Sequence, residues 1–232
     1  MKIHISSTPE TNKSLIKEVI EVLKQSKGEF FEFIGLDPMD EEDLNILDPN
    51  LINQNLNTYE LSLDEILNIC SKYKYINKIP TDDFLIVLTG MKIKEEWFSA
   101  FRKRAIFVDV NNWESLINND RKYGISHQIF ENIFQSLIGL EIEGDLDPLI
   151  HKDRPIGCIN DFCDEKRDIE YKLMTARICP KCLDRAYQKI DNPLLIKSIQ
   201  SQFESIRKLL MTNIENIQDV IPPIIIKNNG KI

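Results

Sequence analysis

The residues most able to do chemistry in this 232-residue chain are four cysteines that form two close pairs. Cys158 and Cys163 are separated by four residues, Cys179 and Cys182 by two, and fifteen residues lie between the pairs. Zinc takes sulfur ligands at about 2.3 Å in a tetrahedral arrangement, and two short loops can deliver four thiolates in that way. We therefore predict one zinc ion bound by these four cysteines.

The predicted zinc site is closed to substrate. Four protein ligands leave no coordination position for water, so the zinc is expected to be structural and no catalytic residue is assigned. A redox-active Cys-x-x-Cys is the alternative, although that motif usually opens a helix after a strand and needs no second cysteine pair. The fifth cysteine, Cys70, stands alone and is expected to be a small buried residue.

Two of the three histidines could take part in a second metal site. His127 and Glu131 are four residues apart and would share one face of a predicted helix, and His151 follows later in the chain. Together they could form a His-Glu-His centre with an open position. The alternative is structural, because a His–Glu pair at this spacing commonly stabilises a helix.

The N-terminal third predicts a β-α-β unit. A strand is expected at Lys2–Ile5, and Ser7-Thr8-Pro9-Glu10 has the form of a capping box that opens a helix ending at Lys27-Gly28. A second strand is expected at 30–34. The polar stretch 36–57, with its acidic run Asp40-Glu41-Glu42-Asp43, is expected to be a solvated loop.

The middle of the chain predicts buried strands and amphipathic helices. A capping box at Ser62 to Glu65 opens a helix, and the apolar runs Phe84–Leu88 and Ala105–Val108 predict strands covered on both faces. A turn or short helix is expected at 93–101, and an amphipathic helix at 125–140. The expected fold class is α/β, a mixed sheet sandwiched by helices.

The C-terminal part predicts a long helix from about Leu194 to Ile217. Its apolar side chains recur every three or four residues, which indicates packing on the same domain or on a second copy of the chain. A late edge strand is expected at 222–226. We expect an α/β domain over 1–150, a four-cysteine zinc-binding segment over 151–190, and the helix and tail over 191–232.

The cysteine spacing resembles that of the archaemetzincins, a family of zinc metallopeptidase-like proteins. In that family a helix with the motif HExxHxxGxxH is followed by C-x4-C and C-x2-C pairs that hold a structural zinc. Residues 84–90 and 104–108 resemble the strands that precede the family's catalytic helix. The resemblance covers roughly residues 84–182 and implies a metzincin-like fold.

The catalytic half of the family's motif does not carry over. With His127 in the first position, the glutamate position is Gln128 and the second histidine position is Glu131. The glycine and third histidine positions are Phe134 and Leu137. Gln128 cannot accept a proton as glutamate does, so the usual general base is absent.

Charge and hydrophobicity limit the partners. Residues 1–150 carry 15 basic and 26 acidic side chains, and this balance disfavours broad contact with nucleic acid. The apolar stretches are too short for a membrane span, and the first residues lack the apolar segment of a signal peptide, so a cytoplasmic location is expected.

Three functions are consistent with these features. The first is a catalytically degenerate archaemetzincin-like protein with one structural zinc, which binds a protein partner and could form a homodimer through its C-terminal helix. The second is a hydrolase with a rebuilt centre at His127, Glu131 and His151. The third is a zinc-ribbon nucleic-acid binder that uses the basic residues of the cysteine segment, namely Lys152, Arg154, Lys166, Arg167, Arg177 and Lys181.

Overall fold

The fold is described from a computed structural model that covers most of the chain. The described residues are 1–25, 30–51, 54–56, 58–117, 120–142, 146–152, 155–165 and 167–218, without the side chains of 213–218. The stop at Lys27-Gly28, the bases Arg154 and Lys166, and the strand expected at 222–226 lie outside these residues.

A five-stranded mixed sheet forms the centre of the described part, in the order β2-β1-β4-β7-β6. The first four of these strands are parallel, and β6 runs antiparallel to β7 at the edge. A further small pair joins β3 to β5. The strands are β1 (Lys2–Ser7), β2 (Glu32–Gly35), β3 (Glu60–Leu61), β4 (Phe84–Thr89), β5 (Lys92–Ile93), β6 (Ser99–Arg102) and β7 (Ala105–Asp109).

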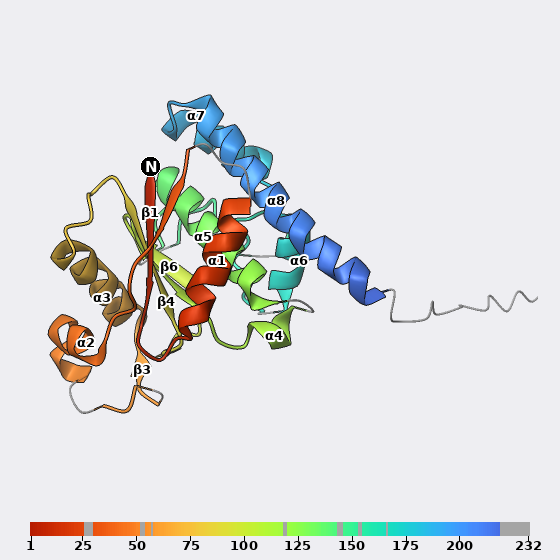
Figure 1. The fold of residues 1–232 in the computed structure, drawn as a ribbon. Coiled ribbons are helices and arrows are strands. Elements are labelled where there is room, and N and C mark those ends of the chain that lie inside the picture. Colours follow the sequence, from red (N-terminus) through yellow and green to blue (C-terminus); the bar gives the residue numbers. More distant parts are fainter. Residues whose placement is uncertain are drawn as a thin grey trace, which may run out of the picture.

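Helices cover both faces of the sheet. Figure 1 shows α2 and α3 on one side, and α1, α5 and α8 on the other. The helices are α1 (Lys13–Gln25), α2 (Glu41–Leu47), α3 (Leu63–Ile76), α4 (Trp113–Leu116), α5 (Arg121–Leu137), α6 (Asp168–Thr175), α7 (Pro180–Lys189) and α8 (Pro193–Gln218), with a 3-10 turn at Pro49–Leu51. The predicted class, a mixed α/β sheet sandwiched by helices, is confirmed.

The buried strands follow the apolar runs in the sequence. Every residue of β4 is buried, because helices lie on both faces and strands pair on both edges. The capping box at Ser62 is confirmed: its hydroxyl accepts the backbone N–H of Glu65, and the Glu65 carboxylate accepts the N–H of Ser62. Cys70 is fully buried in α3, as expected.

The first helix begins later than the sequence predicts. Glu10 does not cap it: its carboxylate accepts the Thr8 hydroxyl and the backbone N–H of Gly90, 2.9 Å away. The helix starts at Lys13, after Asn12 accepts the N–H of Ser14 at 3.0 Å. The capping-box prediction was wrong here because Glu10 binds the loop after β4 instead.

The stretch 36–57 is not the solvated loop that its polarity predicts. Asp40 and Asp43 form a reciprocal capping box that opens α2. Met39, Leu44 and Leu47 are buried. The acidic run therefore begins a helix that covers α3.

The stretch 93–101 also differs from its prediction. Its last three residues belong to β6, the antiparallel edge strand, in place of a turn or short helix. The tight turn at Lys103, whose φ is 55°, returns the chain from β6 into β7.

The three helices α1, α5 and α8, which lie on the same face of the sheet, pack on one another. α5 begins at Arg121, four residues before the predicted start, and α8 crosses α1, α5, α6 and α7. The apolar side chains that recur along α8 are buried within the chain at Ile199, Phe203, Ile206 and Leu210. Among the described residues, none of the helices combines the length and hydrophobicity that a membrane span requires.

Candidate metal centre and the polar pocket on α5

Four side chains in the C-terminal half bring their ligand atoms together. His151, Cys158, Cys179 and Cys182 place one nitrogen and three sulfur atoms within 4.8 Å of one another. The three cysteines are buried and the histidine is half-buried. Among the described residues this is the group of ligating side chains that has the geometry of a metal site.

The separations in this group agree with tetrahedral zinc. With Zn–S bonds of about 2.3 Å and Zn–N bonds of about 2.0 Å, two sulfurs lie about 3.8 Å apart, and sulfur and nitrogen about 3.5 Å apart. The Cys158 and Cys182 sulfurs are 3.9 Å apart. His151 Nε2 lies 3.4 Å from Cys179 Sγ and 3.6 Å from Cys182 Sγ. The four residues therefore fit zinc in both donor type and spacing.

Backbone contacts hold the histidine beside the cysteines. His151 pairs with the segment after Cys158: its N–H donates to Asn160 O at 2.9 Å, and its carbonyl accepts from Phe162 N at 3.0 Å. These contacts form an isolated parallel bridge to Asp161. Through this bridge His151 reaches the sulfur of Cys179, which lies 28 residues further along the chain.

The Asp161 carboxylate fixes the turn that carries Cys158. Its Oδ2 accepts the backbone N–H groups of Ile156 at 2.9 Å, Gly157 at 2.7 Å and Cys158 at 3.1 Å. Gly157 has φ of 76°, and a Cβ there would lie 2.7 Å from the Thr175 hydroxyl oxygen. Glycine is therefore required at this position on both conformational and steric grounds.

Cys179 is the N-cap residue of α7, and Pro180 follows in the first turn. The Cys179 N–H points at Cys158 Sγ, 3.4 Å away. The hydrogen-bonding contact with Cys182 lowers the pKa of the Cys158 thiol to about 5, and the backbone N–H groups of Asn160 and Cys179 act in the same direction. These contacts favour the thiolate form of Cys158, which a metal ligand requires, whereas the neighbouring Cys158 sulfur raises the pKa of the Cys182 thiol.

Cys163 lies outside the four-residue group in the described part of the chain. Its backbone φ is 49°, and its side chain lines a neighbouring pocket. Burial raises the pKa of the Cys163 thiol to about 12. The structure thus brings together three of the four predicted cysteine ligands and adds His151, which the sequence had suggested for a different centre.

The other candidate residues lie on the buried polar face of α5. His127 Nδ1 and Glu131 Oε2 are 3.8 Å apart, whereas His151 lies with the cysteines. Glu131 Oε1 instead accepts a hydrogen bond from Lys172 of α6, with Nζ 2.7 Å away. Lys172 Nζ also donates to Asp161 O at 2.7 Å.

Burial shifts the pKa values of both titratable groups on this face. It raises the pKa of Glu131 to about 7, against the effect of the Lys172 ammonium. Burial and then repulsion from Lys172 lower the pKa of His127 to about 3. At neutral pH His127 is therefore neutral, and its ring packs on Phe203 with 5.1 Å between centroids.

A row of amides connects the metal centre to this face. Asn160 Nδ2 donates to Cys182 Sγ at 3.1 Å, and its Oδ1 accepts from Gln135 Nε2 at 3.3 Å. Gln135 Nε2 also donates to Glu131 Oε1 at 3.2 Å. The two clusters of ligating side chains are therefore parts of one buried network.

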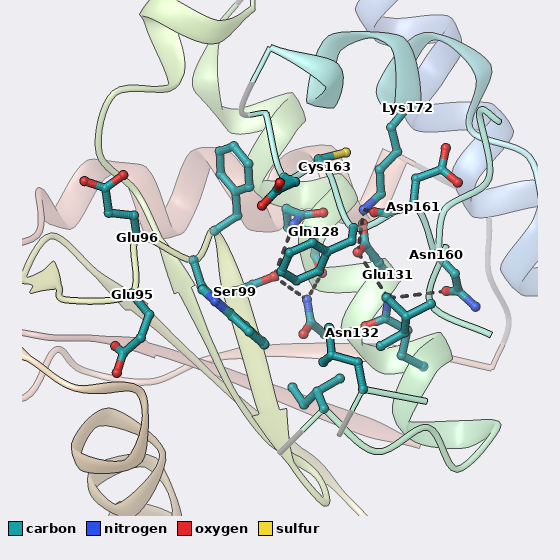
Figure 2. A pocket seen from close by; sticks show the side chains of 18 residues that line it. Glu95, Glu96, Ser99, Gln128, Glu131, Asn132, Asn160, Asp161, Cys163 and Lys172 are labelled. Carbon is teal, nitrogen blue, oxygen red and sulfur yellow. Dashed lines mark hydrogen bonds and ion pairs between the residues drawn. The ribbon is translucent and has the colours of Figure 1, made fainter. Parts of the chain in front are cut away.

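A pocket of about 310 Å³ opens beside this network. Figure 2 shows Gln128, Glu131 and Asn132 of α5 in its floor, with Lys172 beyond Glu131. Glu95 and Glu96 lie on the opposite side from Lys172 in the same view.

Neither Lys172 nor Asn160 is marked as a site residue by a local motif. Lys172 was one base among several, and its contact with Glu131 spans 41 residues. Asn160 lies between Cys158 and Cys163 in the sequence. This position alone could have indicated a role at the metal centre.

Three solved structures resemble the chain over most of its length. Archaemetzincin from Archaeoglobus fulgidus, complexed with malonate, gives a TM-score of 0.48 at 16% identity, covering 80% of this chain and 99% of that one. Archaemetzincin from Methanopyrus kandleri gives 0.47 at 13% identity, covering 83% and 96%. A zinc-dependent peptidase from Methanocorpusculum labreanum gives 0.43 at 16% identity, covering 79% and 99%.

The two archaemetzincins belong to the family that the cysteine spacing resembles. No protein-family model and no curated protein matches the sequence.

Proposed function

We propose that this protein is a non-hydrolytic binding protein, acting on a protein partner or in regulation. One zinc ion bound by His151, Cys158, Cys179 and Cys182 stabilises its C-terminal half. When bound, the zinc supplies four coordination bonds that join the His151 loop, the Cys158 turn and the start of α7. These four ligands leave no position for a substrate.

The observation that carries the proposal is the contact between the Lys172 ammonium of α6 and the Glu131 carboxylate of α5. A hydrolytic zinc typically has three protein ligands and an open position, and Glu131 is the carboxylate that such a centre would use here. Its Oε1 is already 2.7 Å from Lys172 Nζ, and both side chains are buried. A divalent ion at the same carboxylate would face a buried positive charge in a low-dielectric environment.

Two further features of the same face support the proposal. Gln128 occupies the motif position at which a hydrolase would carry its general base, a glutamate. Its Nε2 donates to Ser99 Oγ at 3.2 Å. An amide at this position does not take up a proton as a carboxylate does. His151 would have to leave Cys179 and Cys182 to join His127.

The experiment measures metal content and hydrolysis on the same purified protein. We expect one zinc per chain by mass spectrometry and no metal-dependent cleavage of a fluorogenic peptide library. Two zinc ions per chain, with a hydrolysis that His127→Ala abolishes while the circular dichroism spectrum is unchanged, would overturn the proposal. His4→Ala is the matched control because His4 lies in β1, where its Nε2 is 3.6 Å from Asp83 Oδ2.

A further inference from the structure

We propose that the pocket on α5 binds a positively charged amine, an alkylammonium or guanidinium group carried by a free amine or by a basic side chain of a peptide. This inference rests on the proposed non-hydrolytic function, because it assigns the pocket a ligand and no reaction. Three features of the pocket support it: its charge, its aromatic wall and an unsatisfied acceptor in its floor.

The charge of the pocket is negative. Its lining includes five acidic residues and one basic residue. The base, Lys172, is paired with Glu131, and Asp161 Oδ2 is held by backbone N–H groups. A hollow lined by one sign of charge attracts ions of the opposite sign. The other three acidic residues that line the pocket are exposed to solvent. They are Glu95, Glu96 and Asp164.

The wall of the pocket is aromatic. Trp97 and Phe162 both line it and pack edge to face, with 5.5 Å between their centroids. Both side chains are half-buried, so part of their surface faces the hollow. Ammonium and guanidinium groups are attracted to aromatic faces, and tryptophan is the best of these.

The floor offers an acceptor that no described residue satisfies. Gln128 is 3% exposed and donates through Nε2 to Ser99, while its Oε1 has no hydrogen-bond partner in the described structure. Figure 2 shows Gln128 beside Ser99 and Asn132 among the lining side chains. A buried acceptor without a partner costs free energy, and an amine or guanidinium cation carries donors and no acceptor. The Gln128 oxygen is itself covered in this structure, so a rotation of its side chain would bring it into contact with such a ligand.

The size of the hollow suits one basic side chain. A volume of about 310 Å³ lies at the lower end of the range for small-molecule sites. A second hollow of about 550 Å³ adjoins it and shares Glu95, Trp97, Ile142 and Leu146 with it. The rest of a longer ligand, such as a peptide backbone, would extend there.

An anionic ligand is the rival, because Lys172 also lines the pocket. The Lys172 side chain is 3% exposed, and its ammonium donates to Glu131 and to a backbone carbonyl. An anion would have to displace these acceptors and pass three exposed carboxylates. The geometry therefore favours the cation.

The test measures binding to the full-length, zinc-loaded chain by calorimetry, with Trp fluorescence as a second readout. The probes are agmatine, butyrate, and capped Gly-Lys-Gly, Gly-norleucine-Gly and Gly-Glu-Gly tripeptides. We expect the lysine tripeptide or agmatine to bind, with affinity falling as salt rises, and the neutral and anionic probes not to bind. Tighter binding of the tripeptide identifies a peptide side chain as the source, and tighter binding of agmatine identifies a free amine.

A matched pair of double variants checks the location. Glu95→Gln/Glu96→Gln should weaken binding about threefold to tenfold, because two exposed charges are lost. Glu41→Gln/Glu42→Gln removes two exposed acids from α2 and should leave binding unchanged. Binding of butyrate or the glutamate tripeptide, no binding of any cation, or equal effects of both double variants would overturn the proposal. Zinc content measured on the same sample separates this failure from failure of the proposed function.

Discussion

The metal centre and the polar face of α5 are two buried clusters of ligating side chains with opposite electrostatics. At the centre, three sulfurs and one imidazole nitrogen meet without a cationic side chain among them. On α5, the carboxylate of Glu131 already contacts the ammonium of Lys172. Residue types alone therefore do not make a metal site. A protein cation in contact with a ligand atom opposes the binding of a metal ion to that atom.

The largest expected effect comes from breaking the metal centre. Cys179→Ser should lose its zinc and on the order of 5 kcal/mol of unfolding free energy, because metal binding contributes directly to folding. Zinc content and urea unfolding measure both losses. Cys70→Ala is the control, since Cys70 is buried in α3 and should leave the zinc in place. Full zinc content in Cys179→Ser would show that the centre is misassigned.

At the buried pair between α5 and α6, Lys172→Met should cost about 3 kcal/mol at pH 8, because Glu131 is left buried without its cation. The cost should be smaller at pH 5, where Glu131, with its pKa raised to about 7, is protonated in the folded wild type. Urea unfolding at the two pH values measures this difference. The double variant Glu131→Leu/Lys172→Met should recover most of the loss, and a double variant as unstable as the single one would argue against the pair.

Two substitutions test whether His151 or Cys163 is the fourth zinc ligand. His151→Ala should weaken zinc binding by at least about 100-fold, while Cys163→Ser should change it by less than about threefold. Competition with a chromophoric chelator measures both affinities. The reverse pattern would return Cys163 to the ligand set and exclude His151.

The smallest expected effect concerns His127. Its pKa is about 3 in the folded protein against an ordinary value of 6.5, so the unfolded chain takes up the proton first as the pH falls. Stability should therefore be retained above pH 6.5 and lost below it, by about 2 kcal/mol between pH 8 and pH 5. Measured by urea unfolding, His127→Leu should show a flatter pH profile than the wild type. Parallel profiles would contradict this assignment.

Much of the fold could be predicted because its strongest signals are local. β4 and β7 were recognisable as unbroken apolar runs, and α3 by its capping box. β6 was missed because an edge strand of four residues with Ser99 and Arg102 at its ends lacks such a run. α2 was missed although Asp40 and Asp43 have capping-box spacing, because the polarity of the stretch outweighed it.

The candidate site could be predicted less completely because its contacts are distant in sequence. Cysteine spacing indicates a metal without specifying the fourth ligand. That choice depends on the bridge between His151 and Asp161 and on the backbone turn at Cys163. The contact between Lys172 and Glu131 follows from how α6 packs and has no periodic signal.

The amide row between Cys182 and Glu131 has a fixed polarity. A metal-bound thiolate carries no proton and only accepts, so the nitrogen of Asn160 must face Cys182. Its oxygen then faces Gln135, whose nitrogen is directed to both Asn160 and Glu131. With zinc bound, the ionised Cys182 sulfur would thus order two amide side chains in sequence, and Glu131 would receive donors from Gln135 as well as from Lys172.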